Sequence, residues 1–152
     1  MTPTEGAPAP RTSTTSITDA PTLSVVMPVF DAMRFLGRSL PPLAAALGRD
    51  VLEWIVVDDG STDGSPEFAA GQGARVLTSG GRLGPAAARN VGARAARGDL
   101  LLFVDADVVM RADVPALLRA AFGAPGHANV VAIFGSYDDT PPDPALASGY
   151  MN

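Results

Sequence analysis

The 152-residue chain contains no cysteine, no lysine and only one histidine. The absence of cysteine excludes disulfide bonds, thiolate metal sites and cysteine nucleophiles. All positive side chains are arginines, a bias that we interpret as that of a GC-rich bacterial genome. The histidine, His127, lies in the turn-like segment APGHAN, where we expect a solvated surface residue, with a catalytic role as the alternative.

Long hydrophobic runs are also missing. No apolar segment approaches the ~20 residues that a membrane-spanning helix needs, and the N-terminus lacks the charged start and apolar stretch of a secretory signal. We therefore expect a cytoplasmic location, with membrane association of a longer protein left open. The net charge of −5 disfavours nucleic acid as a partner, because phosphate backbones are bound by clustered cations.

The sequence predicts a short tail followed by one folded domain. Residues 1–21 consist mostly of Thr, Pro, Ser and Ala and cannot bury enough apolar surface to fold, so we predict a disordered tail. Residues 22–152 are rich in apolar side chains and are long enough for one domain with its own core.

Apolar runs and helix-like segments alternate along that domain. The runs are mostly continuous rather than alternating, which is typical of strands that are buried on both faces of a parallel sheet. Together they predict an α/β fold, a Rossmann-like, doubly wound, mostly parallel sheet. The expected strands are 23–29, 52–58, 74–78, 100–106 and 129–135, and the expected helices are 32–47, 64–71, 85–97 and 113–122.

Prolines and glycines mark the expected helix ends. Pro85 suits the first position of its helix and Gly98 suits the C-terminal cap. Asp113 before Val114-Pro115 predicts a capped helix start. We expect Pro41-Pro42 to break or kink the first helix.

The run LLLFVDADVV places Asp105 and Asp107 at the end of an expected buried strand. Residues i and i+2 of extended backbone point the same way, so the two carboxylates should project together. Like charges this close need a cation between them, and carboxylate oxygens suit Mg²⁺ or Mn²⁺. The alternatives are a capped helix start or a solvated loop.

Two further segments follow strand ends, where open α/β sheets bind ligands. In VVDDGSTDGS, Asp58 or Asp59 could accept hydrogen bonds from a ribose or a base. The alternative is a turn in which Asp63 or Ser65 caps the next helix. In GRLGPAAARN, glycines precede an expected helix N-terminus, and Arg82 and Arg89 lie nearby. This arrangement suits a diphosphate, and the alternative is a surface loop with solvated arginines.

Three segments in order, LSVVMPVFDAMRFL, EWIVVDDGSTDGS and LGPAAARNVGARAARGDLLLFVDADVV, resemble the family 2 glycosyltransferases of the GT-A fold. This resemblance implies sugar transfer from a nucleoside diphosphate donor, most often a UDP-sugar, with inversion at the anomeric carbon, to a saccharide or lipid-linked acceptor. It also implies a Mn²⁺ or Mg²⁺ cofactor. By position, it assigns donor binding to Pro28, Asp59, Gly84, Arg89, Asn90 and Asp105, and metal binding to Asp105 and Asp107.

The chain departs from the family pattern in two places. The first motif usually ends in Tyr-Asn, whereas this chain has Phe30-Asp31. Family members usually continue well beyond Asn152, the last residue here, through an acceptor-binding half that carries the general base. We therefore expect a truncated donor-binding domain whose catalytic base lies beyond Asn152. Asp138 and Asp139 could face the acceptor or form an Asp-Pro turn.

Three other functions stay open. A nucleotidyltransferase also uses a metal and an α/β fold, but it would need a Gly-rich loop after the first strand, and MPVFDAMRF has no glycine. A non-catalytic nucleotide-sugar binder would keep the same acidic motifs. A purely structural α/β domain is the third alternative.

Overall fold

The computed structural model describes residues 20–124, 126 and 129–135. The described strands are β1 (Leu23–Val29), β2 (Glu53–Asp58), β3 (Arg75–Thr78) and β4 (Leu100–Phe103), and the described helices are α1 (Met33–Ala46), α2 (Ser65–Gly71), α3 (Pro85–Ala95) and α4 (Val114–Gly123).

Several predictions fall on residues outside the described ranges. These are residues 1–19 of the tail predicted over residues 1–21, and the candidate residues His127, Asp138 and Asp139. Asn152, beyond which we expect the general base, also lies outside the described residues. The location of the base therefore stays a prediction.

The four strands form one parallel sheet in the order β3-β2-β1-β4. All seven residues of β1 are buried, in agreement with a predominantly apolar strand at the centre of a sheet. The chain adds β2 and β3 on one side of β1 and then returns to add β4 on the other. The carboxyl ends of β1 and β4 therefore flank the point where the strand order reverses, the usual ligand-binding crevice of such sheets.

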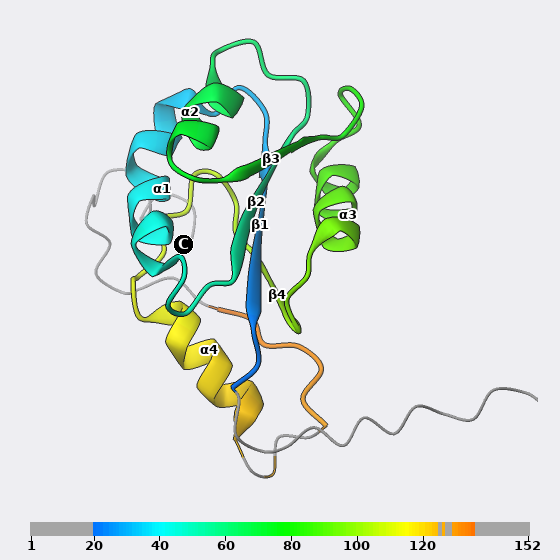
Figure 1. Ribbon diagram of the computed structural model, residues 1–152. Coiled ribbons are helices and arrows are strands. Elements are labelled where there is room, and N and C mark those ends of the chain that lie inside the picture. Colours follow the sequence, from blue (N-terminus) through cyan, green and yellow to red (C-terminus); the bar gives the residue numbers. More distant parts are fainter. Residues whose placement is uncertain (1–19, 125, 127–128, 136–152) are drawn as a thin grey trace, which may run out of the picture.

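Helices cover both faces of the sheet, as Figure 1 shows: α1 and α2 lie on one face and α3 on the other. The larger core cluster joins α1 to β1 and β2, with Leu36, Leu40 and Trp54 among its fully buried members. A smaller cluster joins α3 to the opposite face through Ala88 and Val26. These layers confirm the predicted doubly wound α/β fold.

Of the break or kink expected at Pro41-Pro42, the break does not occur, because α1 continues through both prolines to Ala46. Each proline lacks a backbone N–H, so the pair removes two backbone hydrogen bonds from the helix. Buried leucines on both sides of the pair, Leu40 and Leu43, pack against the sheet and hold the helix in place. Tertiary packing therefore outweighs the local preference of the sequence.

Gly92 in α3 and Gly98 in the loop that follows allow close packing against β1. The helix ends at Ala95, and the residue at its C-cap is Ala96, so the predicted cap at Gly98 is wrong. A Cβ on Gly98 would lie 2.6 Å from the backbone nitrogen of Ser24, and one on Gly92 would lie 2.3 Å from Cγ1 of Val26. Both glycines let α3 and its following loop approach β1, and this approach sets the position of the helix.

Two other predictions at the ends of elements need correction. Asp113 is the N-cap residue of α4, but its side chain makes no capping hydrogen bond and pairs instead with Arg111.

The strand predicted over residues 129–135 is not formed. A strand needs a hydrogen-bonded neighbour, and no ladder reaches these described residues, so Val131 and Phe134 remain 94% and 93% exposed. Among the described helices, none has the length and apolarity that a membrane crossing requires.

Candidate donor-binding site

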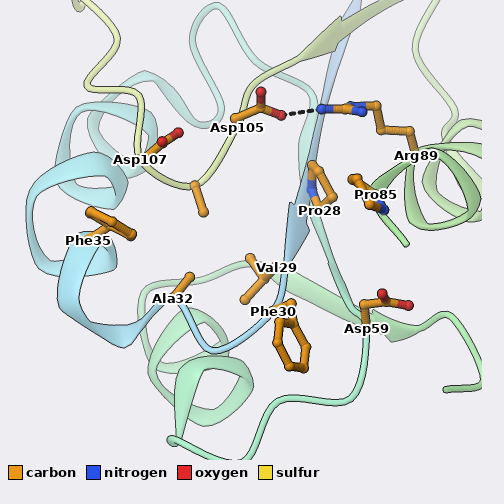
Figure 2. A pocket seen from close by; sticks show the side chains of 11 residues that line it. Pro28, Val29, Phe30, Ala32, Phe35, Asp59, Pro85, Arg89, Asp105 and Asp107 are labelled. Atoms are coloured by element: carbon orange, nitrogen blue, oxygen red, sulfur yellow. Dashed lines mark hydrogen bonds and ion pairs between the residues drawn. The ribbon is translucent and has the colours of Figure 1, made fainter. Parts of the chain in front are cut away.

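A pocket of about 360 Å³ opens at the carboxyl ends of β1 and β4 (Figure 2). Its lining is Pro28, Val29, Phe30, Ala32, Phe35, Asp59, Pro85, Arg89, Asp105, Ala106 and Asp107. Five of the seven predicted site residues thus meet in one cavity. The other two, Gly84 and Asn90, do not line it.

The two aspartates of the Asp-Ala-Asp triplet do not lie on a strand. β4 ends at Phe103, and the Val108 amide donates a 3.0 Å hydrogen bond to the Asp105 carbonyl, which closes a turn over the triplet. The prediction that extended backbone points both carboxylates the same way was therefore wrong, because the triplet lies in a turn. Both side chains nevertheless line the same pocket. Figure 2 shows Asp105 directed at Arg89, with Asp107 at the same end of the cavity.

The carboxylate of Asp105 forms an ion pair with Arg89 of α3. The Asp105 side chain is 55% exposed and that of Arg89 is 34% exposed, so the pair lies at the mouth of the pocket rather than in the core. Asp107 is exposed beside it. One end of the pocket therefore holds two carboxylates and one guanidinium.

A hard divalent cation fits this donor set. The described residues contain no group of three or more His, Cys, Asp or Glu side chains that could enclose an ion. Mg²⁺-like ions commonly bind one or two carboxylates and complete their coordination with water and substrate phosphates. Asp105 and Asp107 offer this partial shell.

Asp59 has a different environment from the exposed pair. It is 6% exposed, and its carboxylate accepts hydrogen bonds from the Leu83 amide (2.9 Å), the Gly84 amide (2.8 Å) and the Ser79 hydroxyl (2.5 Å). The Ser79 hydrogen bond, assisted by the two amides and opposed by burial, holds the pKa of Asp59 below its ordinary value of 3.8. Asp59 is therefore an ionised anchor that fixes the loop before α3 against the end of β2.

This anchoring explains the position of the predicted glycine-rich segment. Gly84 is the N-cap residue of α3, with φ of 88°, and its amide is bound to Asp59. Arg82, in the same loop, lies over the ring of Phe30 at 4.0 Å from its centroid. Asn90 is exposed and lies outside the lining. The segment thus contributes Pro85 and Arg89 to the pocket, one helical turn apart.

The VVDDGSTDGS segment forms the turn that was the alternative interpretation. Asp58 accepts hydrogen bonds from the Gly60 and Ser61 amides. Asp63 accepts the Met33 amide at the start of α1 (2.8 Å) and the Ser65 amide at the start of α2 (3.0 Å). One carboxylate therefore ties together the starts of two helices.

Asp31 has a structural role that its local sequence does not indicate. It has a φ of 43°, in the left-handed region where Asp and Asn are the favoured non-glycine residues. Its carboxylate accepts the Thr62 amide at 2.8 Å, and its own amide donates to the Ser61 hydroxyl at 3.0 Å. This link between loops 31 residues apart could not be read from local sequence. Its neighbour Phe30 lines the pocket at the end away from Asp105, as Figure 2 shows.

Comparison with known proteins agrees with this geometry. The sequence profile described as glycosyl transferase family 2 matches residues 24–150. A validoxylamine A glucosyltransferase from Streptomyces hygroscopicus subsp. limoneus is 35% identical over 150 residues, which cover 92% of this chain and 32% of that protein. The chain spans about a third of the length of the curated relatives it matches.

Solved structures with the same fold include complexes with bound nucleotides. Glucosyl-3-phosphoglycerate synthase from Mycobacterium tuberculosis, in complex with Mn²⁺, UDP and glucosyl-3-phosphoglycerate, has a TM-score of 0.56 and 27% identity, covering 68% of this chain and 39% of that one. S. aureus TarS 1-349 in complex with UDP-GlcNAc has a TM-score of 0.59 and 27% identity, covering 66% and 31%. These likenesses place the described sheet and helices in the GT-A fold.

Proposed function

The chain belongs to glycosyl transferase family 2, and from this premise we propose that its pocket binds a nucleoside diphosphate sugar, with a UDP-sugar as the favoured donor, for inverting transfer of a hexosyl group. One observation carries the proposal. Two carboxylates and an arginine meet at the switch point of the sheet, in a cavity whose other end is lined by an aromatic ring and a buried aspartate.

The two ends of the pocket suit the two ends of such a donor. Arg89 offers a guanidinium to the diphosphate, and Asp105 and Asp107 offer oxygen ligands to Mn²⁺ or Mg²⁺. Phe30 and Pro28 offer apolar contacts to a base. Asp59 uses three hydrogen bonds to hold its loop, but Oδ2 receives only one of these, so it can still accept a base N–H. The Mn²⁺ and UDP in the solved relative support this assignment.

The chemistry assigned to these residues concerns the leaving group. In an inverting transfer, an acceptor hydroxyl attacks the anomeric carbon while the diphosphate departs with growing negative charge. A divalent cation bound to the carboxylates would offset that charge. Arg89 would orient the diphosphate and would also help to offset its negative charge. The loop anchored by Asp59 would keep α3 in position. Gly84 and Asn90 border the site, and we retain them as donor-side candidates without direct contact.

We propose that the general base and the acceptor site lie beyond Asn152, outside these 152 residues. No described residue of the pocket is placed as a base toward an acceptor, since Asp59 is an ionised structural anchor and the exposed pair is assigned to the cation. The acceptor would be a saccharide or a lipid-linked hydroxyl compound. A second candidate is a nucleotide-sugar binder that does not catalyse transfer by itself, which is consistent with the lack of a general base among the described residues of the pocket.

Calorimetric titration with UDP, with and without Mn²⁺, tests the donor site. We expect UDP binding that depends on Mn²⁺ and is lost in Asp107→Asn, and a melting temperature that rises with ligand, because binding to the folded state alone stabilises it. Asp113→Asn, an exposed change outside the pocket, is the control and should bind normally. Equal UDP binding with and without metal would contradict the metal site. Slow release of sugar from a UDP-sugar without acceptor would separate an enzyme from a binder.

A further inference from the structure

We propose that Arg89 is a positioning residue whose ion pair with Asp105 is broken when a divalent cation binds. The freed guanidinium then binds the donor diphosphate. The inference rests on the proposed function and adds an order of events to it. Its basis is that one carboxylate, that of Asp105, already has a partner inside the pocket that is assigned to metal binding.

The backbone around Arg89 is held firmly, which leaves the side chain as the moving part. Ala88, beside it, is fully buried against the sheet, and Gly92 lies so close to β1 that a Cβ would meet Val26. The loop before the helix is anchored through Asp59. Arg89 therefore projects from a fixed point beside the pocket, and its long side chain can reach different partners without movement of α3.

Arg89 and a cation compete for the same carboxylate, that of Asp105. The guanidinium contacts Oδ1 of Asp105, and a cation bound to that carboxylate would face a positive group at short range, which raises the cost of binding. Asp107 is the only other acidic residue in the lining besides the buried Asp59, so the described pocket offers no ready substitute for Asp105. Cation binding should therefore break the ion pair.

When a diphosphate is present, Arg89 favours ligand binding instead of opposing it. Once the cation holds Asp105, the guanidinium needs a new anionic partner, and a diphosphate in the same pocket accepts paired hydrogen bonds from arginine. Arg89 should then oppose cation binding when no nucleotide is present and favour nucleotide binding when the cation is present. A residue that served only to stabilise the fold would not change these two affinities in opposite directions.

The experiment compares the intact chain with Arg89→Gln. Electron paramagnetic resonance counts free Mn²⁺ in a titration without nucleotide, and calorimetry measures UDP affinity at saturating Mn²⁺. We expect Mn²⁺ to bind Arg89→Gln about two- to fivefold more tightly, as expected for loss of a partly exposed ion pair, and UDP to bind at least about tenfold more weakly. Arg89→Lys keeps the charge and should restore most of the wild-type Mn²⁺ affinity.

Arg94→Gln provides the matched control, because Arg94 is an exposed residue of the same helix outside the pocket lining. It should leave both affinities unchanged, and thermal melts check that every variant folds. Mn²⁺ affinity that is unchanged or weaker in Arg89→Gln overturns the inference, while Mn²⁺-dependent UDP binding by the unaltered chain would still support the proposed function. If neither the unaltered chain nor Arg89→Gln binds Mn²⁺, both the inference and the metal site are overturned.

Discussion

Replacing Asp59 by asparagine should destabilise the protein through two backbone hydrogen bonds. The Leu83 amide donates to Oδ1 and the Gly84 amide to Oδ2. Asparagine keeps the shape of the side chain but has only one acceptor oxygen. In either orientation, its NH2 group therefore points at one of the two backbone N–H groups, and at least one partly buried donor is left without a partner.

The size of the effect follows from these contacts. Hydrogen bonds to a charged group contribute about 1.5–3 kcal/mol each, and an unsatisfied buried donor costs about 1–3 kcal/mol. We expect Asp59→Asn to lower the free energy of unfolding by about 2–4 kcal/mol, a large share of the stability of a small domain. The loop before α3 should loosen as well, so the affinity for UDP and Mn²⁺ should fall with it.

Urea unfolding followed by tryptophan fluorescence measures this change directly. Trp54 is the only tryptophan and is 1% exposed, so unfolding transfers it from the core to water. Asp107→Asn is the matched control, because it makes the same chemical change at an exposed position of the same pocket. It should alter stability by less than about 0.5 kcal/mol. Equal stability of the two variants would refute the anchoring role of Asp59.

Three further predictions concern packing and acid stability. Gly92→Ala should lower the free energy of unfolding by about 1–3 kcal/mol, because its Cβ would overlap Val26. Gly37→Ala, in open space on α1, should raise the free energy of unfolding by about 0.5–1 kcal/mol. Urea midpoints of the two variants that move in the same direction would disprove this reasoning. Glu53→Gln should cost about 1–3 kcal/mol, since the buried carboxylate accepts the Arg97 amide at 2.7 Å; an unchanged melting temperature would count against it. Burial alone would raise the pKa of Glu53, but hydrogen bonds, those from Arg97 first, hold it below the ordinary 4.5, and the pKa of Asp59 is below 3.8. The unfolded chain therefore takes up protons first, so stability should be full above about pH 5 and fall as the pH drops through and below these values, less steeply in Glu53→Gln; a urea midpoint that is flat or rises toward pH 3 would contradict the sign.

The sequence was sufficient to predict the elements whose signal is local. β1 was predicted with its observed bounds, because six of its seven residues are apolar and the strand is buried on both faces. The segment 129–135 has a similar composition but forms no strand, because a strand also needs a neighbour that local sequence does not specify. The continuation of α1 through Pro41-Pro42 depends on packing against the sheet, which the local rule for proline ignores.

The sequence was sufficient to predict most residues of the site, but not the contacts between them. Strand-end placement brought Pro28, Asp105 and Asp107 to one pocket. The contacts that define their roles join residues that are far apart in sequence, such as Asp59 with the Gly84 amide and Arg89 with Asp105. The turn over residues 105–108 replaced the expected extended backbone. Local spacing therefore indicates which side chains gather, whereas packing decides which of them anchor the fold and which face the ligand.

The most direct test of the account is a crystal structure of the chain grown with UDP and Mn²⁺, with the metal located by its anomalous scattering. The account predicts a manganese peak in contact with the carboxylates of Asp105 and Asp107 and with the diphosphate, and Arg89 turned from Asp105 to the phosphate oxygens. A fully occupied nucleotide with manganese elsewhere, or a peak that persists unchanged in Asp107→Asn crystals with Arg89 still paired to Asp105, would contradict the central claim that the paired aspartates hold a metal against a nucleoside diphosphate.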